Sequence, residues 1–129
     1  MSLFKALLGI CETKPLDSKA WSVDDGKVIV NLDDAAGLKN NSAVYLEGHG
    51  LERPILIVNV AGNYHAFSNR CRHLGRKLDL VPGKNRLRCC SLMHSEYDLD
   101  GKVIKGPATE PVNKYEVSQT EGNLIISLS

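Results

Sequence analysis

The sequence lacks any apolar run long enough to cross a membrane. The stretch from Leu3 to Ile10 is about eight residues long and is interrupted by Lys5, whereas a membrane helix needs about 20 apolar residues. There is also no convincing secretory signal and no basic cluster beside this stretch. We therefore expect residues 1–22 to form an N-terminal arm that packs on the rest of the domain. We also expect a cytoplasmic protein with no membrane anchor.

Helical periodicity, internal repeats and low-complexity linkers are nearly absent. Turn signals recur about every ten residues, and the runs between them are short and either β-branched or alternating. This pattern is typical of an all-β fold, a small antiparallel sandwich or barrel. The run from Ile55 to Val60 is almost continuously apolar, which predicts a central strand buried on both faces. The predicted strands are residues 27–32, 43–47, 55–60, 64–68, 86–89, 115–118 and 123–128.

The chain also lacks a strong excess of charge. The length of 129 residues predicts one domain, spanning residues 1–129. The net charge of +1 predicts no nucleic-acid partner. The basic residues are unevenly placed, however. Between Arg70 and Arg88, seven basic residues accompany one acidic residue, Asp79. This segment is either a solvated face or a surface that steers acidic partner proteins.

Only four cysteines are present, and in a cytoplasmic protein such spacing indicates metal or redox chemistry more often than disulfides. Cys71 and His73 are two residues apart, and Cys90 and His94 follow in a second segment. Thiolates suit iron clusters and zinc, and imidazoles suit zinc, copper and iron. The four residues could therefore hold a [2Fe-2S] cluster or a structural Zn²⁺ ion.

Several segments resemble the Rieske [2Fe-2S] family over roughly residues 25–129. Cys71 to Gly75 is similar to the first box of that family, C-x-H-x-G, and Cys90 falls at the usual separation for the second box. Ser95 to Leu99 resembles the stretch after the second box, and Lys105 to Ala108 resembles a proline loop that covers the cluster. The resemblance implies a small antiparallel β-sandwich with two cluster-binding loops within residues 69–108.

The resemblance also implies roles for individual residues. The metal ligands would be Cys71, His73, Cys90 and His94. The surroundings of the cluster would be Leu74, Gly75, Ser95, Tyr97, Gly106 and Pro107, and the Ser95 and Tyr97 hydroxyl groups would donate to cluster sulfur atoms and raise the reduction potential.

The second box departs from the family pattern. By register Met93 stands where the histidine ligand is expected, and His94 follows one residue later. We expect His94 to bind, with Met93 as the alternative, because a soft, uncharged thioether is a poor substitute for imidazole on ferric iron. Respiratory members carry an extra cysteine in each box, where this chain has Arg76 and Leu92, so the chain is closer to the soluble ferredoxin type.

The expected function is one-electron transfer, because no nucleophile or acid/base pair accompanies the cluster residues. A monomeric ferredoxin of this kind would exchange electrons with a reductase and with an oxygenase or other acceptor. Two alternatives stay open. The chain could be a subunit of a larger reductase, of the nitrite-reductase small-subunit type, whose cluster is lost or altered, or it could hold structural zinc. Outside the site, we expect Cys89 to be a buried strand residue and His49 and His65 to be surface or hydrogen-bonded histidines.

Overall fold

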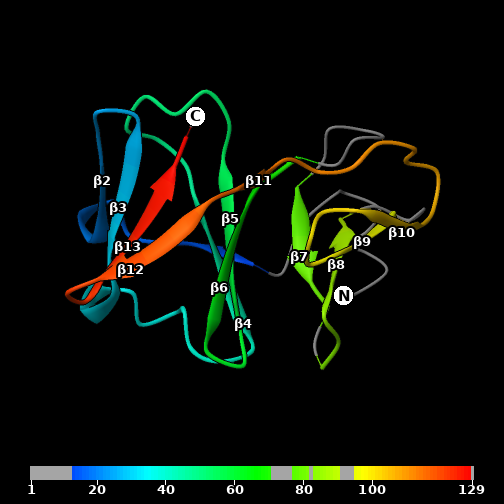
Figure 1. Ribbon diagram of the computed structural model, residues 1–129, viewed down its shortest axis with the longest axis horizontal. Coiled ribbons are helices and arrows are strands. Elements are labelled where there is room, and N and C mark those ends of the chain that lie inside the picture. Colours follow the sequence, from blue (N-terminus) through cyan, green and yellow to red (C-terminus); the bar gives the residue numbers. More distant parts are fainter. Residues whose placement is uncertain (1–12, 71–76, 82, 91–94, 129) are drawn as a thin grey trace.

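The computed structural model describes residues 13–70, 77–81, 83–90 and 95–128. The described chain is built almost entirely of short strands (Figure 1). Its helical pieces are two 3-10 turns, η1 (Ser18–Ala20) and η2 (Leu32–Asp34), and among the described residues no helix has the length and apolarity of a bilayer span. The strands are β1 (Lys14–Pro15), β2 (Trp21–Asp24), β3 (Lys27–Asn31), β4 (Ser42–Leu46), β5 (Ile55–Val60), β6 (Asn63–Ser68), β7 (Leu78–Leu80), β8 (Arg86–Cys89), β9 (Glu96–Asp98), β10 (Val103–Lys105), β11 (Lys114–Tyr115), β12 (Val117–Thr120) and β13 (Asn123–Ser127).

These strands form three sheets that stand side by side in Figure 1. The central sheet has the order β1-β4-β5-β6-β11. On one side of it lies the distal sheet, β12-β13-β3-β2, and on the other side lies the loop-bearing sheet, β10-β9-β8-β7. All neighbours pair antiparallel except β1 and β4. The predicted all-β, antiparallel fold class is therefore confirmed.

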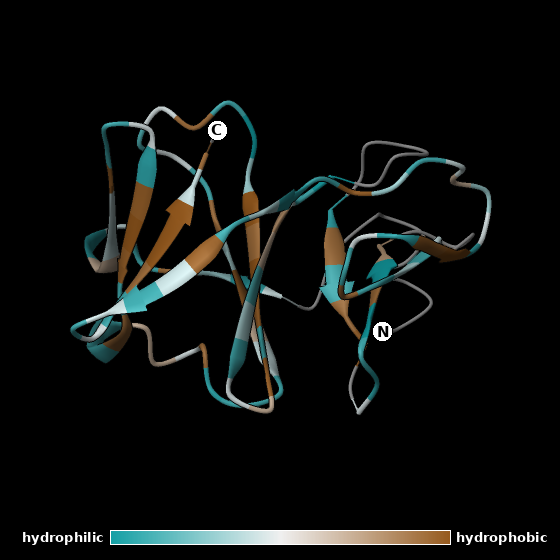
Figure 2. Ribbon diagram, in the orientation of Figure 1, coloured by the Kyte–Doolittle hydropathy of each residue, from teal (hydrophilic) through white to brown (hydrophobic). Residues whose placement is uncertain are grey.

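Strand β5 is buried on both faces because the central sheet lies between two hydrophobic cores. Successive side chains of a strand point to opposite faces, so Ile55 and Ile57 enter the core shared with the distal sheet. Leu56 and Val58 enter the core shared with the loop-bearing sheet. This arrangement explains the nearly continuous apolar run, drawn in brown in Figure 2, and confirms the predicted central strand.

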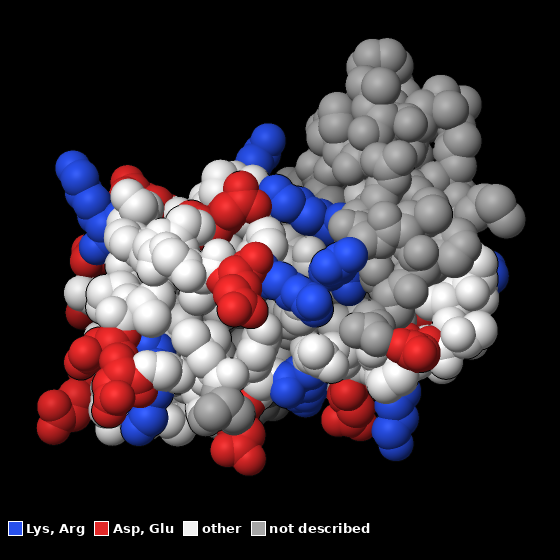
Figure 3. All heavy atoms as spheres, turned by 90° about the horizontal axis from the view of Figure 1, so that it is seen from above, with Lys and Arg blue, Asp and Glu red and all other residues white. Residues whose placement is uncertain are grey.

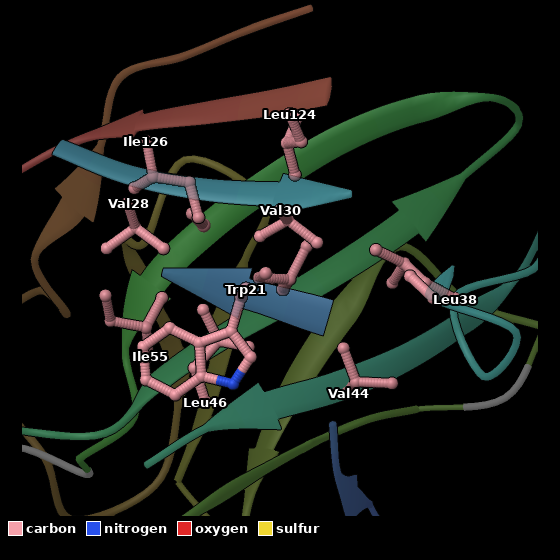
Figure 4. Close-up of a cluster of buried hydrophobic side chains, with 12 residues drawn as sticks. Trp21, Val28, Val30, Leu38, Val44, Leu46, Ile55, Leu124 and Ile126 are labelled. Atoms are coloured by element: carbon pink, nitrogen blue, oxygen red, sulfur yellow. The ribbon is translucent and has the colours of Figure 1, made fainter. Parts of the chain in front are cut away.

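The distal core is organised around Trp21, whose ring lies beside Leu46 and Ile55 in Figure 4. Trp21 is 4% exposed, and its ring meets the ring of His49 edge-on with a centroid distance of 4.2 Å. The Nε2 atom of His49 lies 3.0 Å from the Ser18 carbonyl oxygen. His49 is therefore a hydrogen-bonded histidine, as predicted, and the distal core supplies a rigid base.

The described part of the N-terminal arm joins the central and loop-bearing sheets. Strand β1 pairs in parallel with β4, and the backbone N–H of Thr13 donates to the Asp79 carboxylate on β7 at 2.9 Å. Residues 1–12 of the predicted arm lie outside the described residues. Residues 21 and 22, at its predicted end, already belong to β2.

Candidate metal centre

Cys90 is the predicted metal ligand that the structure describes. It directly follows β8, a strand whose side chains alternate so that Leu87 and Cys89 are buried. The Cys90 residue is 0% exposed, and its backbone N–H donates to the Lys77 carbonyl oxygen at 3.0 Å. Strand pairing and this hydrogen bond therefore fix the backbone from which the Cys90 side chain projects.

The other predicted ligands lie outside the described residues. This applies to Cys71, His73 and His94, to the alternative ligand Met93, and to the predicted surrounding residues Leu74 and Gly75. The structure nevertheless fixes both ends of the two segments that contain them. Asn69 and Leu78 flank the first segment, and Cys90 and Ser95 flank the second.

The two ends of the second segment are hydrogen-bonded to each other. The backbone N–H of Cys89 donates to the Ser95 carbonyl oxygen at 2.9 Å. Ser95 is 0% exposed, and so is Tyr97 on β9. Both predicted hydroxyl donors are therefore buried on the segment that returns from Cys90, where their O–H groups are shielded from water.

Ser95 also connects the second segment to the predicted proline loop. Its Oγ accepts a hydrogen bond from the backbone N–H of Ala108 at 3.1 Å. Accepting this bond leaves the hydroxyl hydrogen of Ser95 available for donation. Gly106, at φ +104°, begins the turn after β10, a conformation that favours glycine. The structure thus brings Ser95 together with the loop that contains Gly106 and Pro107.

Two buried polar atoms just before the first segment have no hydrogen-bond partner among the described residues. They are Oγ of Ser68 and Nδ2 of Asn69, and these residues are 4% and 2% exposed. Buried polar atoms are rarely left unpaired, so these atoms are suited to an acceptor or donor supplied by a bound group. Sequence reasoning missed Asn69, because an asparagine at the end of a strand carries no metal-ligand signal.

The cysteine chemistry of the centre is compatible with iron. Thiolate is the form in which Cys90 would bind a metal. The neighbouring Cys89 is 1% exposed and lies within the core, which confirms the prediction of a buried strand residue.

Some basic side chains around the centre are already paired. The Nζ atom of Lys77 lies 3.3 Å from the Glu47 carboxylate and 4.3 Å from the centroid of the Tyr45 ring. Arg86 lies 3.5 Å from Glu96. Figure 3 shows lysine and arginine side chains gathered on one face, with acidic side chains among them. Only part of the basic segment is therefore available to attract a partner.

The joint between the central and loop-bearing sheets contains His65 and Lys114. The Lys114 Nζ atom lies 3.1 Å from His65 Nδ1 and donates to the Leu99 carbonyl oxygen at 2.7 Å. Burial, followed by the positive charge of Lys114, lowers the pKa of His65 below its usual 6.5, although Asp100 acts in the opposite direction. His65 is thus a hydrogen-bonded histidine, as predicted.

Comparison with known proteins gives a family match over most of the chain. The family model for the Rieske [2Fe-2S] domain matches residues 28–116. Among curated proteins, the cytochrome b6-f complex iron-sulfur subunit of Chlorobaculum tepidum is 29% identical over 75 residues, which are 58% of this chain. The chain spans 41% of the length of that relative.

Solved structures share the same fold. The ferredoxin of carbazole 1,9a-dioxygenase from Nocardioides aromaticivorans IC177 is 21% identical with a TM-score of 0.64, over 78% of this chain and 95% of that one. A structure described as a complex of reduced oxygenase and oxidized ferredoxin in carbazole 1,9a-dioxygenase contains a chain with a TM-score of 0.67 and 15% identity, over 81% of this chain and 95% of that one.

Proposed function

Because this chain belongs to the Rieske [2Fe-2S] domain family, we propose that it is a soluble one-electron carrier that shuttles between a reductase and an oxygenase or other acceptor protein. Membership in this family supports the predicted [2Fe-2S] cofactor, and the proposal assigns the chain electron transfer without catalysis of its own. The observation that carries the proposal is the buried Cys90, which is held at the end of β8 and whose N–H donates to the carbonyl oxygen of Lys77, just after the first ligand segment.

The proposed ligands are Cys71, His73, Cys90 and His94. A cluster bound by two thiolates and two neutral imidazoles accepts one electron more readily than a cluster bound by four thiolates, because it is less negatively charged. The protein's own contribution is to hold the Cys90 backbone, to exclude water and to present the buried Ser95 and Tyr97 hydroxyl groups as donors.

The proposed docking surface lies on β10, next to the proline loop. Ile104 is 42% exposed, and Val23 is the other large apolar side chain that the described residues leave exposed. Exposed lysines, Lys102 and Lys105, flank Ile104. An apolar contact between positive charges fits a redox partner with an acidic rim. The fold likeness to a ferredoxin from an oxygenase complex also supports a protein partner.

The test is to purify the chain anaerobically under reducing conditions and to measure iron, sulfide, the visible spectrum and the low-temperature EPR of the dithionite-reduced protein. We expect two irons and two sulfides per chain and a mixed-ligand EPR signal. A colourless, EPR-silent protein would overturn the carrier proposal. Stoichiometric zinc in that protein would select the structural metal site instead.

Two neighbouring thiols provide a matched pair for the ligand assignment. Cys90→Ser should abolish the cluster, whereas Cys89→Ser should retain it, because Cys89 belongs to the hydrophobic core between the central and loop-bearing sheets. Equal cluster loss in both variants would contradict the assignment of Cys90. Analytical ultracentrifugation of the loaded protein tests the proposed monomer.

The position of the second histidine is tested in the same way. His94→Ala should lose the mixed-ligand EPR signal and Met93→Ala should keep it. Loss of this EPR signal in the Met93 variant alone would identify the Met93 thioether as the fourth ligand. The shifted histidine also favours one alternative function, a subunit of a larger reductase with an altered cluster. A protein that never binds iron but copurifies with a reductase would support that alternative.

A further inference from the structure

One peptide group connects the two segments that carry the proposed cysteine ligands. The N–H of Leu78 donates to Oδ1 of Asn69 at 2.8 Å. The carbonyl of Lys77, which belongs to the same planar peptide group, accepts from the N–H of Cys90 at 3.0 Å. The side chain of Asn69 and the backbone of Cys90 are therefore held at opposite ends of one rigid unit.

Asn69 itself is anchored to the central sheet. Its backbone N–H donates to the Pro54 carbonyl oxygen at 2.8 Å, and Asn69 directly follows β6, a strand that pairs along its full length with β5. The backbone from which the Asn69 side chain projects is therefore held in place by the central sheet. Because Asn69 stands two residues before Cys71, the hydrogen bond to Leu78 closes the base of the first segment.

The hydrogen bonds run in one direction along this unit. Cys90 donates to the peptide carbonyl, and the N–H of the same peptide donates to the Asn69 amide oxygen. Such chains polarise each member in turn, so the Nδ2 hydrogens of Asn69 become stronger donors. Nδ2 is also buried, with no hydrogen-bond partner among the described residues.

We infer that Asn69 is a positioning residue of the cluster centre, which fixes the spacing between the two cysteine segments through Oδ1 and supplies Nδ2 as a donor to a sulfur acceptor of the centre. The inference rests on the proposed function, since the acceptor is a thiolate or sulfide of the loaded cluster. Donors to these sulfur atoms raise the reduction potential.

The decisive variant is Asn69→Ala, which removes both the acceptor and the donor. We expect iron release from the loaded protein to become about tenfold faster and the reduction potential to fall. Asn69→Asp keeps the oxygen that accepts from Leu78, so it should restore iron retention while its potential stays below that of the wild type. Wild-type retention and potential in the alanine variant, or equal iron loss in both variants, would overturn the inference.

A second buried asparagine gives the control. Asn59 on β5 is 6% exposed, donates to the Leu38 carbonyl oxygen at 3.3 Å and accepts from the Gly62 N–H at 3.1 Å. Asn59→Ala also removes two hydrogen bonds of a buried side chain, but in a part of the central sheet away from the ligand segments. It should lower the melting temperature without changing the reduction potential. A matching shift in potential in this control would overturn the inference, because general destabilisation would then explain both variants.

Amide hydrogen exchange in the cluster-free protein separates this inference from the proposed function. The N–H groups of Leu78 and Cys90 should exchange slowly in the wild type and faster in Asn69→Ala. Rapid exchange of Leu78 in the wild type would overturn the positioning role whether or not a cluster binds. A chain that never binds a cluster but protects both amides would instead refute the proposed function.

Discussion

Lys114 on β11 donates from Nζ to the carbonyl oxygen of Leu99, at 2.7 Å, and so links the central sheet to the end of β9. The same ammonium group lies 3.7 Å from the Asp100 carboxylate. The loop-bearing sheet is small and its strands are short, so contacts at this joint contribute to its orientation. The ligand segments depend on that orientation, because Cys90 and Ser95 flank strands of the loop-bearing sheet.

Replacement of Lys114 by methionine should loosen this joint. The variant keeps an apolar chain of similar length but loses the bonds to Leu99 and Asp100. We expect a loss of about 1 kcal/mol in the free energy of unfolding, measured by urea denaturation, because the ammonium group is partly exposed. Lys39→Met, on an exposed loop, is the control and should change stability little. Equal losses of unfolding free energy in the two variants would contradict a specific stabilising role for the Lys114 contacts.

Gly101→Ala should be more damaging. Gly101 has φ +86°, and an added Cβ would clash with the Val112 carbonyl oxygen, so the backbone at one of these two residues would have to move. The expected loss is about 2 to 4 kcal/mol, combining backbone strain with the clash, and thermal unfolding measures it. Gly122→Ala isolates the strain, because Gly122 has φ +81° and open space around it. Equal losses of unfolding free energy in Gly101→Ala and Gly122→Ala would contradict the predicted clash with Val112.

His65 makes the stability of the fold depend on pH. Burial and Lys114 lower its pKa in the folded protein, so the unfolded chain binds a proton more readily. Stability should therefore fall as the pH decreases from about 7.5 through 6.5 towards the lower folded pKa. Melting temperatures at about pH 7.5 and pH 5.5 should differ more in the wild type than in His65→Gln. An identical pH dependence of the two proteins would contradict this assignment.

The strands that the sequence predicted correctly share a clear physical signal. β5 has apolar residues on both faces because two cores cover it, and β3 and β13 alternate between buried and more exposed positions. The pattern missed β1 and β2, which fall in and at the end of the predicted N-terminal arm. It also missed β7, β9 and β10, which have three residues each. Three residues are too few to display a period of two, and these strands exist through pairing with β8 and with each other.

The candidate site shows the same division. Cys90 could be named from its residue type and spacing, and Ser95 and Tyr97 could be named from the resemblance to the Rieske family. Asn69 and Lys114 could not, because their roles come from hydrogen bonds to Leu78 and Leu99 that only the folded chain creates. A backbone N–H or carbonyl group is present at almost every residue, so the sequence does not show which one a distant side chain will bind.

The hydroxyl groups near the centre should tune the reduction potential separately from stability. Tyr97→Phe and Ser95→Ala each remove one buried donor, and both should lower the potential measured by spectroelectrochemistry. Ser95→Ala should also destabilise the protein, because the Ala108 N–H then loses its acceptor. We expect about 1 to 3 kcal/mol for that unsatisfied group. Unchanged potentials in both variants would show that neither hydroxyl donates to the cluster.

The lysines beside Ile104 should steer anionic electron acceptors. Stopped-flow oxidation of the reduced protein by ferricyanide, a small anion, measures this attraction without an identified protein partner. Lys105→Glu should slow the bimolecular step by about twofold or more at low salt, and the difference should shrink as ionic strength rises. Lys39→Glu changes the net charge equally on a loop of the central sheet, so it should have a smaller effect. If both reversals slow the reaction alike, net charge alone is responsible and the surface around β10 has no special role.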